Sequence, residues 1–200
     1  MTDIQSSNAE PSPAGNQPGN QVGSLRSTII EFIVIIVVAL AMAWALTNFV
    51  VKPYRIPSGS MLETIQLEDR VLSEKISYYF GQPSQGDIVT FKDPEDSSRV
   101  LIKRVIATAG QTVDLKDGVV YVDGQALDED SYTLGKPSYE LDSIEDVTYP
   151  YTVAEDCIWV MGDNRTDSAD SRYFGAVPIS SVTGHAFFTY WPISSIGLLE

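Results

Sequence analysis

The chain has 200 residues, a length that suits one domain with additional segments at its ends. Its net charge is −14, from 27 acidic and 13 basic residues, and the basic residues form no cluster. Because such a surface repels a phosphate backbone, we expect no nucleic-acid partner.

The N-terminal part of the chain divides into a polar tail and an apolar segment. Residues 1–24 are rich in Ser, Asn, Gln, Gly and Pro, a composition typical of disorder. Residues 32–51 contain only two polar side chains, and this length of helix covers the roughly 30 Å hydrocarbon core of a membrane. We therefore predict a disordered tail over 1–28 and a transmembrane helix over 29–51, with the lipid bilayer as a partner.

A cleavable signal peptide is the alternative for this segment, since residues 41–43, Ala-Met-Ala, are similar to a small-residue cleavage site. The apolar run continues beyond them to Val51, which favours an uncleaved anchor. Few charges flank the segment: Arg26 precedes it, and Lys52 and Arg55 follow it. The small excess of positive charge after the segment, taken alone, would place the C-terminal part of the chain in the cytoplasm.

Beyond residue 51 the sequence changes to short runs of β-branched and aromatic residues bounded by Gly, Asp or Pro, a pattern typical of strands. These runs are RVLSEKI, DIVTF, RVLIKRVIAT, TVDLKDGVVYVDG, CIWVMGD and SVTGHAFFTYWP. Lys116-Asp117-Gly118, between TVDL and VVYV, predicts a β-hairpin. We therefore predict a mainly β fold, with an antiparallel β-sheet domain over 52–200 anchored by one N-terminal transmembrane helix.

Residues 128–150 interrupt this pattern. They contain seven acidic residues and one lysine, with aromatic and proline residues that break any regular alternation. Such a segment predicts an irregular acidic excursion from the β domain.

The single histidine and the single cysteine limit the available chemistry. A Ser-His-Asp triad or a Cys-His pair would require His185, which lies in a strand-like run where a structural position is the more frequent case. Cys157 begins a similar run and is expected to behave as a small buried hydrophobe. No cluster has metal-ligand spacing and no glycine loop has the form of a phosphate cradle, so we expect neither a metal nor a cofactor.

A serine can instead be activated by a neutral lysine, which must be desolvated because its ordinary pKa is about 10.4. In VLIKRVIAT, strand alternation directs Lys103 and Arg104 to opposite faces. The face of Lys103 also has Leu101, Val105 and Ala107, so its neighbours are apolar. The alternative is an edge-strand lysine that protects against aggregation.

Two further segments are unusually polar for their positions. YRIPSGSMLET, residues 54–64, has two serines around a glycine just after the membrane-length segment. MGDNRTDSADSRYFGAVP, residues 161–178, directly follows a predicted strand. Most of the carboxylates and arginines of this second segment are expected to pair with one another, because long loops need internal hydrogen bonds.

Together these segments resemble the type I signal peptidases, a family of membrane-anchored Ser/Lys endopeptidases. PSGSM resembles the nucleophile box of the family, GDIVTF the following strand, KRVI the lysine box and GDNRTDSADSRYFG the last box. The order of these motifs and the preceding apolar segment also match. The resemblance covers residues 30–191, with the N-terminal tail and the acidic excursion outside it.

The resemblance implies a role for each matching residue. Ser60 would be the nucleophile and Lys103 its general base. The Ser58 hydroxyl and the backbone N–H of Ser60 would stabilise the oxyanion, and Ser168 would orient Lys103. The remaining positions form two groups: Arg104, Asp163, Asp170 and Arg172 would support the site, and Ile56, Met61 and Ile102 would line a shallow pocket for small side chains.

The resemblance also implies a cell-membrane protein with its tail in the cytoplasm and its catalytic domain outside, against the charge bias. Only eight residues separate Val51 from Ser60, which keeps the nucleophile within about 30 Å of the end of the apolar segment. The sequence differs from the usual family motifs at two places, and both differences concern loop shape and substrate preference. Glu63 replaces a usual Pro, and residues 107–111, Ala-Thr-Ala-Gly-Gln, replace Gly-Leu-Pro-Gly-Asp.

The predicted function is a cofactor-independent serine endopeptidase that removes signal peptides from exported preproteins after a small-x-small motif, through an acyl-enzyme. One alternative is a Ser/Lys peptidase dedicated to one precursor, which the two departures would motivate. Another is a membrane-anchored β-domain that binds exported proteins without cutting them. A pure binder, however, has no need of Ser58, Ser60, Lys103 and Ser168 together.

Overall fold

The computed structural model describes residues 21–45 and 50–199. Along the sequence, the chain divides into two units between Trp44 and Ala45. The first unit contains α1 (Gln21–Ala45), of which Ser27–Ala45 is apolar and long enough to cross a membrane. The large apolar side chains from Ile29 to Trp44 are exposed on all sides of this helix. A helix of this kind requires an apolar environment, and a lipid bilayer provides one.

Helix α1 begins and ends before the predicted limits of 29 and 51. It includes residues 21–28, which composition assigned to a disordered tail, because an established helix gains one hydrogen bond for each residue added. At the other end, Val51 is the first residue of β1 (Val51–Arg55) and pairs with a neighbouring strand. The rest of the predicted tail and residues 46–49 lie outside the described residues.

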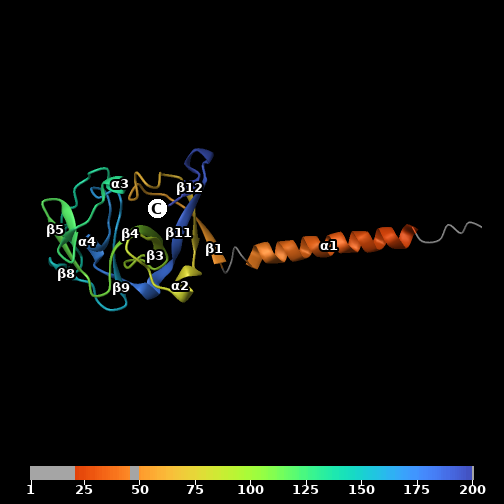
Figure 1. The fold of residues 1–200 in the computed structure, drawn as a ribbon, viewed down its shortest axis with the longest axis horizontal. Helices are drawn as coiled ribbons and strands as arrows, with labels where there is room; N and C mark the ends of the chain where they lie inside the picture. The colour runs from red at the N-terminus through yellow and green to blue at the C-terminus, as the bar shows by residue number, and fades with distance from the viewer. Residues whose placement is uncertain (1–20, 46–49, 200) are drawn as a thin grey trace, which may run out of the picture. The chain divides into compact units, whose positions relative to one another are not determined.

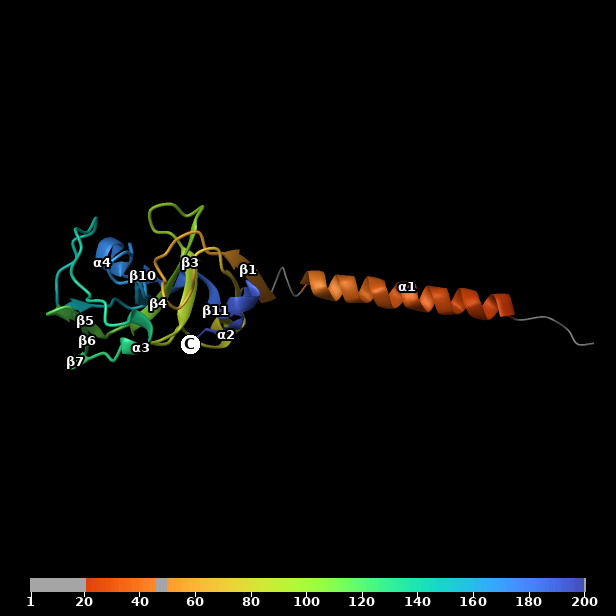
Figure 2. The same ribbon diagram turned by 90° about the horizontal axis from the view of Figure 1, so that it is seen from above.

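The second unit contains two antiparallel sheets (Figure 1), so the predicted mainly β fold is confirmed. The larger sheet has the strand order β1-β2-β11-β3-β4-β9-β10, with β12 paired to β11, and the smaller sheet has the order β7-β6-β5-β8. The smaller sheet lies at the end of the unit opposite to β1 (Figure 2).

Each predicted run contains one or two of the observed strands. The larger sheet consists of β1, β2 (Arg70–Glu74), β3 (Ile88–Lys92), β4 (Val100–Thr108), β9 (Cys157–Met161), β10 (Val177–Pro178), β11 (Val182–Trp191) and β12 (Gly197–Leu198). The smaller sheet consists of β5 (Thr112–Lys116), β6 (Val119–Val122), β7 (Gln125–Ala126) and β8 (Tyr151–Thr152). Single helical turns connect them: α2 (Ser77–Phe80), α3 (Asp130–Thr133), α4 (Ser171–Phe174), η2 (Ile179–Ser181) and η3 (Ile193–Ser195).

Three apolar clusters form the core of the second unit. One lies among β3, β4, β9 and α4 and includes Val89. The second joins β4 and β9 to the smaller sheet, with the ring of Trp159 packed on that of Tyr151. The third includes the fully buried side chains of Met61 and Ile65, each worth about 1.5–3 kcal/mol on transfer from water. This third cluster fixes the loop after β1 against β2, β3 and β4.

The predicted hairpin at Lys116-Asp117-Gly118 is confirmed. Lys116 pairs with Val119, and both turn residues have positive φ, 51° at Asp117 and 81° at Gly118. Such turns match the twist of antiparallel strands. A Cβ on Gly118 would lie 2.8 Å from the Cβ of Pro137, so the acidic excursion packs directly on this turn.

We predict that Gly118→Ala destabilises the detergent-solubilised protein more than Gly124→Ala does. Gly124 has a similar φ of 77°, but a Cβ added there would have no atom within 4 Å. Backbone strain alone should cost about 1 kcal/mol at Gly124, and the added contact with Pro137 should raise the loss to about 2–3 kcal/mol at Gly118. Chemical denaturation followed by circular dichroism measures both. Equal losses would contradict the packing of Pro137 on the turn.

Candidate active site

The centre of the candidate site is a hydrogen bond between a lysine and a serine from separate parts of the chain. Lys103 lies in β4, and its Nζ donates to the Oγ of Ser60, in the loop between β1 and β2, at 2.7 Å. A second bond joins Nζ to the carbonyl oxygen of Ile102 at 3.0 Å. Ser60 is half-buried, whereas Lys103 is only 3% exposed, so the amine is almost completely removed from water.

Burial lowers the pKa of Lys103 to about 8, because the charged form loses its hydration. Nearby carboxylates, first Asp170 and then Asp163, act in the opposite direction, and the charge of Arg172 lowers the pKa further. Desolvation is the largest of these effects, so the neutral amine is accessible near neutral pH. A neutral amine at hydrogen-bond distance can accept the proton of the Ser60 hydroxyl.

A cavity of about 80 Å³ opens beside this pair. Its lining includes Ser58, Ser60 and Lys103 as well as Ile56 and Ile102, which the sequence predicted to line a pocket. The remaining lining residues are Tyr54, Arg55, Pro57, Thr90, Val100 and Leu101. Met61, the third residue predicted to line the pocket, does not line it. Its apolar side chain is fully buried in the core cluster with Ile65.

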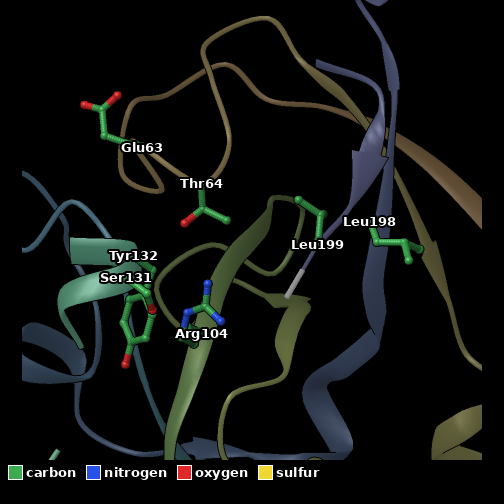
Figure 3. A pocket seen from close by; sticks show the side chains of 7 residues that line it. All are labelled: Glu63, Thr64, Arg104, Ser131, Tyr132, Leu198 and Leu199. Atoms are coloured by element: carbon green, nitrogen blue, oxygen red, sulfur yellow. The ribbon is translucent and has the colours of Figure 1, made fainter. Parts of the chain in front are cut away.

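Arg104, the neighbour of Lys103, forms one of two buried ion pairs of the site. Its Nε and Nη2 each donate to the Asp163 carboxylate at 2.9 Å, and both side chains are almost completely buried. The same carboxylate accepts from the Thr64 hydroxyl at 2.5 Å, which joins the pair to the loop between β1 and β2, residues 56–69. We call this segment the nucleophile loop, after the predicted role of Ser60. The ring of Tyr132 lies 4.2 Å from the guanidinium, and Figure 3 shows Arg104, Thr64 and Tyr132 around one pocket.

Asp170 and Arg172 form the second buried pair. Asp170 is the N-cap of α4, and its two carboxylate oxygens accept from Nε and Nη2 of Arg172 at 2.9 Å each. One of these oxygens also accepts from the backbone N–H of Gly162 at 3.0 Å. A Cβ on Gly162 would meet both the Ser168 hydroxyl and the carbonyl oxygen of Ser60. Glycine is therefore required where the loop after β9 meets the nucleophile loop.

The structure does not form the hydrogen bond between Ser168 and Lys103 that the resemblance implied. The Ser168 Oγ is buried and has no hydrogen-bond partner among the described residues, while the Lys103 Nζ donates to Ser60 and Ile102. The hydroxyl nevertheless lies close to the nucleophile loop, because both contact the space beside Gly162. An orienting role for Ser168 stays a prediction.

Sequence reasoning missed Asn164, which holds the nucleophile loop by two hydrogen bonds. Its backbone N–H donates to the Ser60 carbonyl oxygen at 3.1 Å, and its side-chain Nδ2 donates to the Gly59 carbonyl oxygen at 2.9 Å. Its position next to Asp163 in the GDNR motif marked Asn164 as a candidate site residue. The motif alone, however, does not predict the hydrogen-bond partners of its side-chain amide.

The two departures from the family pattern do not involve the Ser60–Lys103 pair. Residues 107–111 lead from β4 into β5, and the side-chain oxygen of Gln111 accepts there from the backbone N–H of Thr108 at 2.9 Å. The carboxylate usual at this position could accept the same bond. Glu63 is exposed and lies beside Thr64 at the pocket of Figure 3.

His185 and Cys157 do not form the catalytic pair considered above. His185 lies in β11, with Nδ1 3.9 Å from a carboxylate oxygen of Glu74 and its ring 6.2 Å from that of Tyr78. Cys157 begins β9, which is separated from β11 by two strands, and burial raises the pKa of its thiol. The thiol is therefore less reactive than an ordinary cysteine.

The motifs and this geometry agree with a comparison against protein families. A model described as "Signal peptidase, peptidase S26" matches residues 29–191. The chain belongs to this family. It is 43% identical over 178 residues to the "Probable signal peptidase I-1" of Synechocystis sp.. This alignment covers 86% of this chain and 87% of that protein.

Other signal peptidases are similar over different extents. The chain is 36% identical over 194 residues to the signal peptidase I of Leptolyngbya laminosa, covering 94% of this chain and 89% of that protein. The chain is also 31% identical in sequence to a signal peptidase I from Enterococcus faecalis V583 with a known crystal structure. That superposition has a TM-score of 0.41 and covers 52% of this chain and 97% of the other chain. Membership of the signal peptidase family assigns the chain to the peptidases and to signal-peptide processing.

Proposed function

We propose that the chain is a serine endopeptidase that removes N-terminal signal peptides from exported preproteins, with Ser60 as nucleophile and Lys103 as general base. The observation that carries this proposal is the 2.7 Å hydrogen bond from a buried lysine Nζ to the serine Oγ. The lysine has a pKa lowered to about 8 by burial, and this supports a base that acts near neutral pH.

The reaction begins when neutral Lys103 takes the proton of Ser60 Oγ as this oxygen attacks the scissile carbonyl carbon. The Ser58 hydroxyl and the Ser60 backbone N–H stabilise the oxyanion, a role supported by the position of both residues at the cavity. Protonated Lys103 then donates its proton to the leaving amine of the mature protein, and the peptide C–N bond breaks.

Hydrolysis of the acyl-enzyme repeats these steps with water. Lys103 takes a proton from the attacking water and returns it to Ser60 Oγ, and the signal peptide leaves with a new carboxylate. Once acylated, Ser60 Oγ is a poor acceptor for Lys103, and we assign Ser168 to accept the free N–H of Lys103 at this stage. The unpartnered Ser168 hydroxyl supports this assignment.

The cavity also supports a preference for small side chains next to the cleaved bond. Its volume is about 80 Å³, and Ile56 and Ile102 are among the residues that line it. A small-x-small motif before the cleavage site suits a space of this size.

We further propose that α1 anchors the chain in the cell membrane as a single span. Its N-terminal side would lie in the cytoplasm and residues 52–200 on the other side, where exported preproteins emerge. The length and apolar composition of Ser27–Ala45 support the span.

Replacing either of the two loop serines should separate their roles. We predict that Ser60→Ala abolishes cleavage of a preprotein by the detergent-solubilised protein, because no oxygen remains to attack. Ser58→Ala should retain activity that is lower by about 10²–10³-fold, as expected for one lost oxyanion donor. The measurement is the cleavage rate at saturating preprotein. An active Ser60→Ala protein would refute the proposed mechanism, and an unimpaired Ser58→Ala protein would remove Ser58 from the oxyanion site.

The lowered pKa of Lys103 predicts an acid limb in the pH profile. As the pH falls through about 8, Lys103 gains a proton, loses its lone pair and can no longer accept the proton of Ser60. We expect kcat/KM, which reports the ionisation of the free enzyme, to fall on the acid side and to reach a plateau above this pH. Lys103→Arg should be inactive throughout, because a guanidinium stays protonated.

His185→Ala provides the control for this profile. It should preserve the acid limb, since His185 lies in β11 beside Glu74 and Tyr78. Loss of the limb in His185→Ala would identify histidine as the titrating base.

A further inference from the structure

The acidic excursion, residues 128–150, contacts the loop that follows β9 and holds the Ser60 loop, although its sequence indicated no function. Within it, Lys136 donates from Nζ to the Oδ1 of Asn164 at 3.0 Å. We propose that Lys136 is a positioning residue: it holds Asn164, and Asn164 in turn fixes the loop that contains Ser60. This inference rests on the proposed function.

Asn164 is suited to transmit this effect. It is 7% exposed, and its Nδ2 and backbone N–H donate to the carbonyl oxygens of Gly59 and Ser60. The amide has one oxygen and one NH₂ group, so a donor at Oδ1 decides which way the group points. Lys136 is that donor, and it therefore directs Nδ2 at Gly59.

A buried ion pair fixes the excursion next to Asn164. Both carboxylate oxygens of Glu129 accept from Arg165, at 2.6 and 2.7 Å, and the Arg165 side chain is fully buried. Arg165 also donates to the Ser138 hydroxyl at 2.9 Å and to the Gly162 carbonyl oxygen at 2.9 Å. Two-point carboxylate–guanidinium pairs are strong and directional, so the segment that includes Lys136 is held in place.

The excursion also has a second, longer connection to the nucleophile loop. Figure 3 shows Tyr132 and Ser131 of α3 on one side of a pocket, with Glu63 and Thr64 on the other. The Tyr132 ring packs on Arg104, which pairs with Asp163, and the Asp163 carboxylate accepts from the Thr64 hydroxyl. The hydrogen bonds of Asn164 differ from this route because they end at the carbonyl groups of Gly59 and Ser60 themselves.

Small displacements of this loop would affect the reaction rate more than substrate binding. Ser60 supplies both the attacking Oγ and one oxyanion donor, and a misplacement of about 1 Å can cost about 10²-fold in rate. Ile56 and Ile102, which limit the substrate cavity, contact neither Lys136 nor Asn164 through any hydrogen bond of the described residues. Loss of Lys136 should therefore lower kcat with little change in KM.

Lys136→Met tests this directly, because it removes the ammonium group but keeps most of the side-chain length. Lys116→Met is the matched control: Lys116 lies in β5, is exposed and pairs with Asp114. We expect Lys136→Met to lower kcat about tenfold with KM unchanged. The lost hydrogen bond should also lower the thermal midpoint by a few degrees, so kcat is measured well below the unfolding transition. Lys116→Met should match the parent protein, and Lys136→Arg, which keeps a charged donor, should recover most of the activity.

A double-mutant cycle with Asn164→Ala tests whether Lys136 acts through Asn164. In the Asn164→Ala protein, the further change Lys136→Met should have no effect on kcat. If the two effects multiply, or if Lys136→Met behaves like Lys116→Met, the proposal is wrong. A parent protein that cleaves no preprotein would instead refute the proposed function, so the two failures are distinguishable.

Discussion

The proposed mechanism depends on one balance: Lys103 must be removed from water strongly enough to be neutral, although it lies near carboxylates that favour its charged form. Burial is the larger effect, with Asp170 and Asp163 acting against it. Each of these carboxylates is paired with a buried arginine, Arg172 and Arg104 respectively. The charge of Arg172 acts against that of Asp170 on the pKa of Lys103 and offsets part of its effect. The pairs therefore stabilise the loops without cancelling the desolvation of Lys103.

The order of the strands brings these groups together. Arg104 in β4 pairs with Met161 at the end of β9, so the loop that follows β9 starts beside Arg104 and delivers Asp163 to it. Lys103 points to the opposite side of β4, toward Ser60. The nucleophile loop is held there by the burial of Met61 below it and by the hydrogen bonds of Asn164 beside it.

Features encoded by short-range patterns could be predicted from the sequence. The strands, the hairpin at Asp117-Gly118 and the opposite directions of Lys103 and Arg104 all follow from alternation and turn chemistry over a few residues. The described limits of α1 differ from those of the predicted membrane span, because apolar composition marks the segment that suits a membrane, not the residues that form a helix.

Contacts between distant segments could not be predicted in this way. Met61 was expected to line the pocket, but whether an apolar side chain lines a cavity or fills the core depends on the packing of the third cluster. The partners of Asn164 lie 28 and 105 positions away along the chain, at Lys136 and Gly59. No local pattern encodes such pairs, and for this reason the acidic excursion showed no role in the sequence.

The most direct test of this balance is a titration of Lys103 itself. Lysine labelled with ¹³C at Cε allows each side chain of the detergent-solubilised protein to be followed by NMR, and Lys103→Arg assigns the signal by its loss. The predicted midpoint for Lys103 is about 8, clearly below the ordinary lysine value of about 10.4. A midpoint near 10.4 would show that the carboxylates outweigh burial, and would contradict Lys103 as the base.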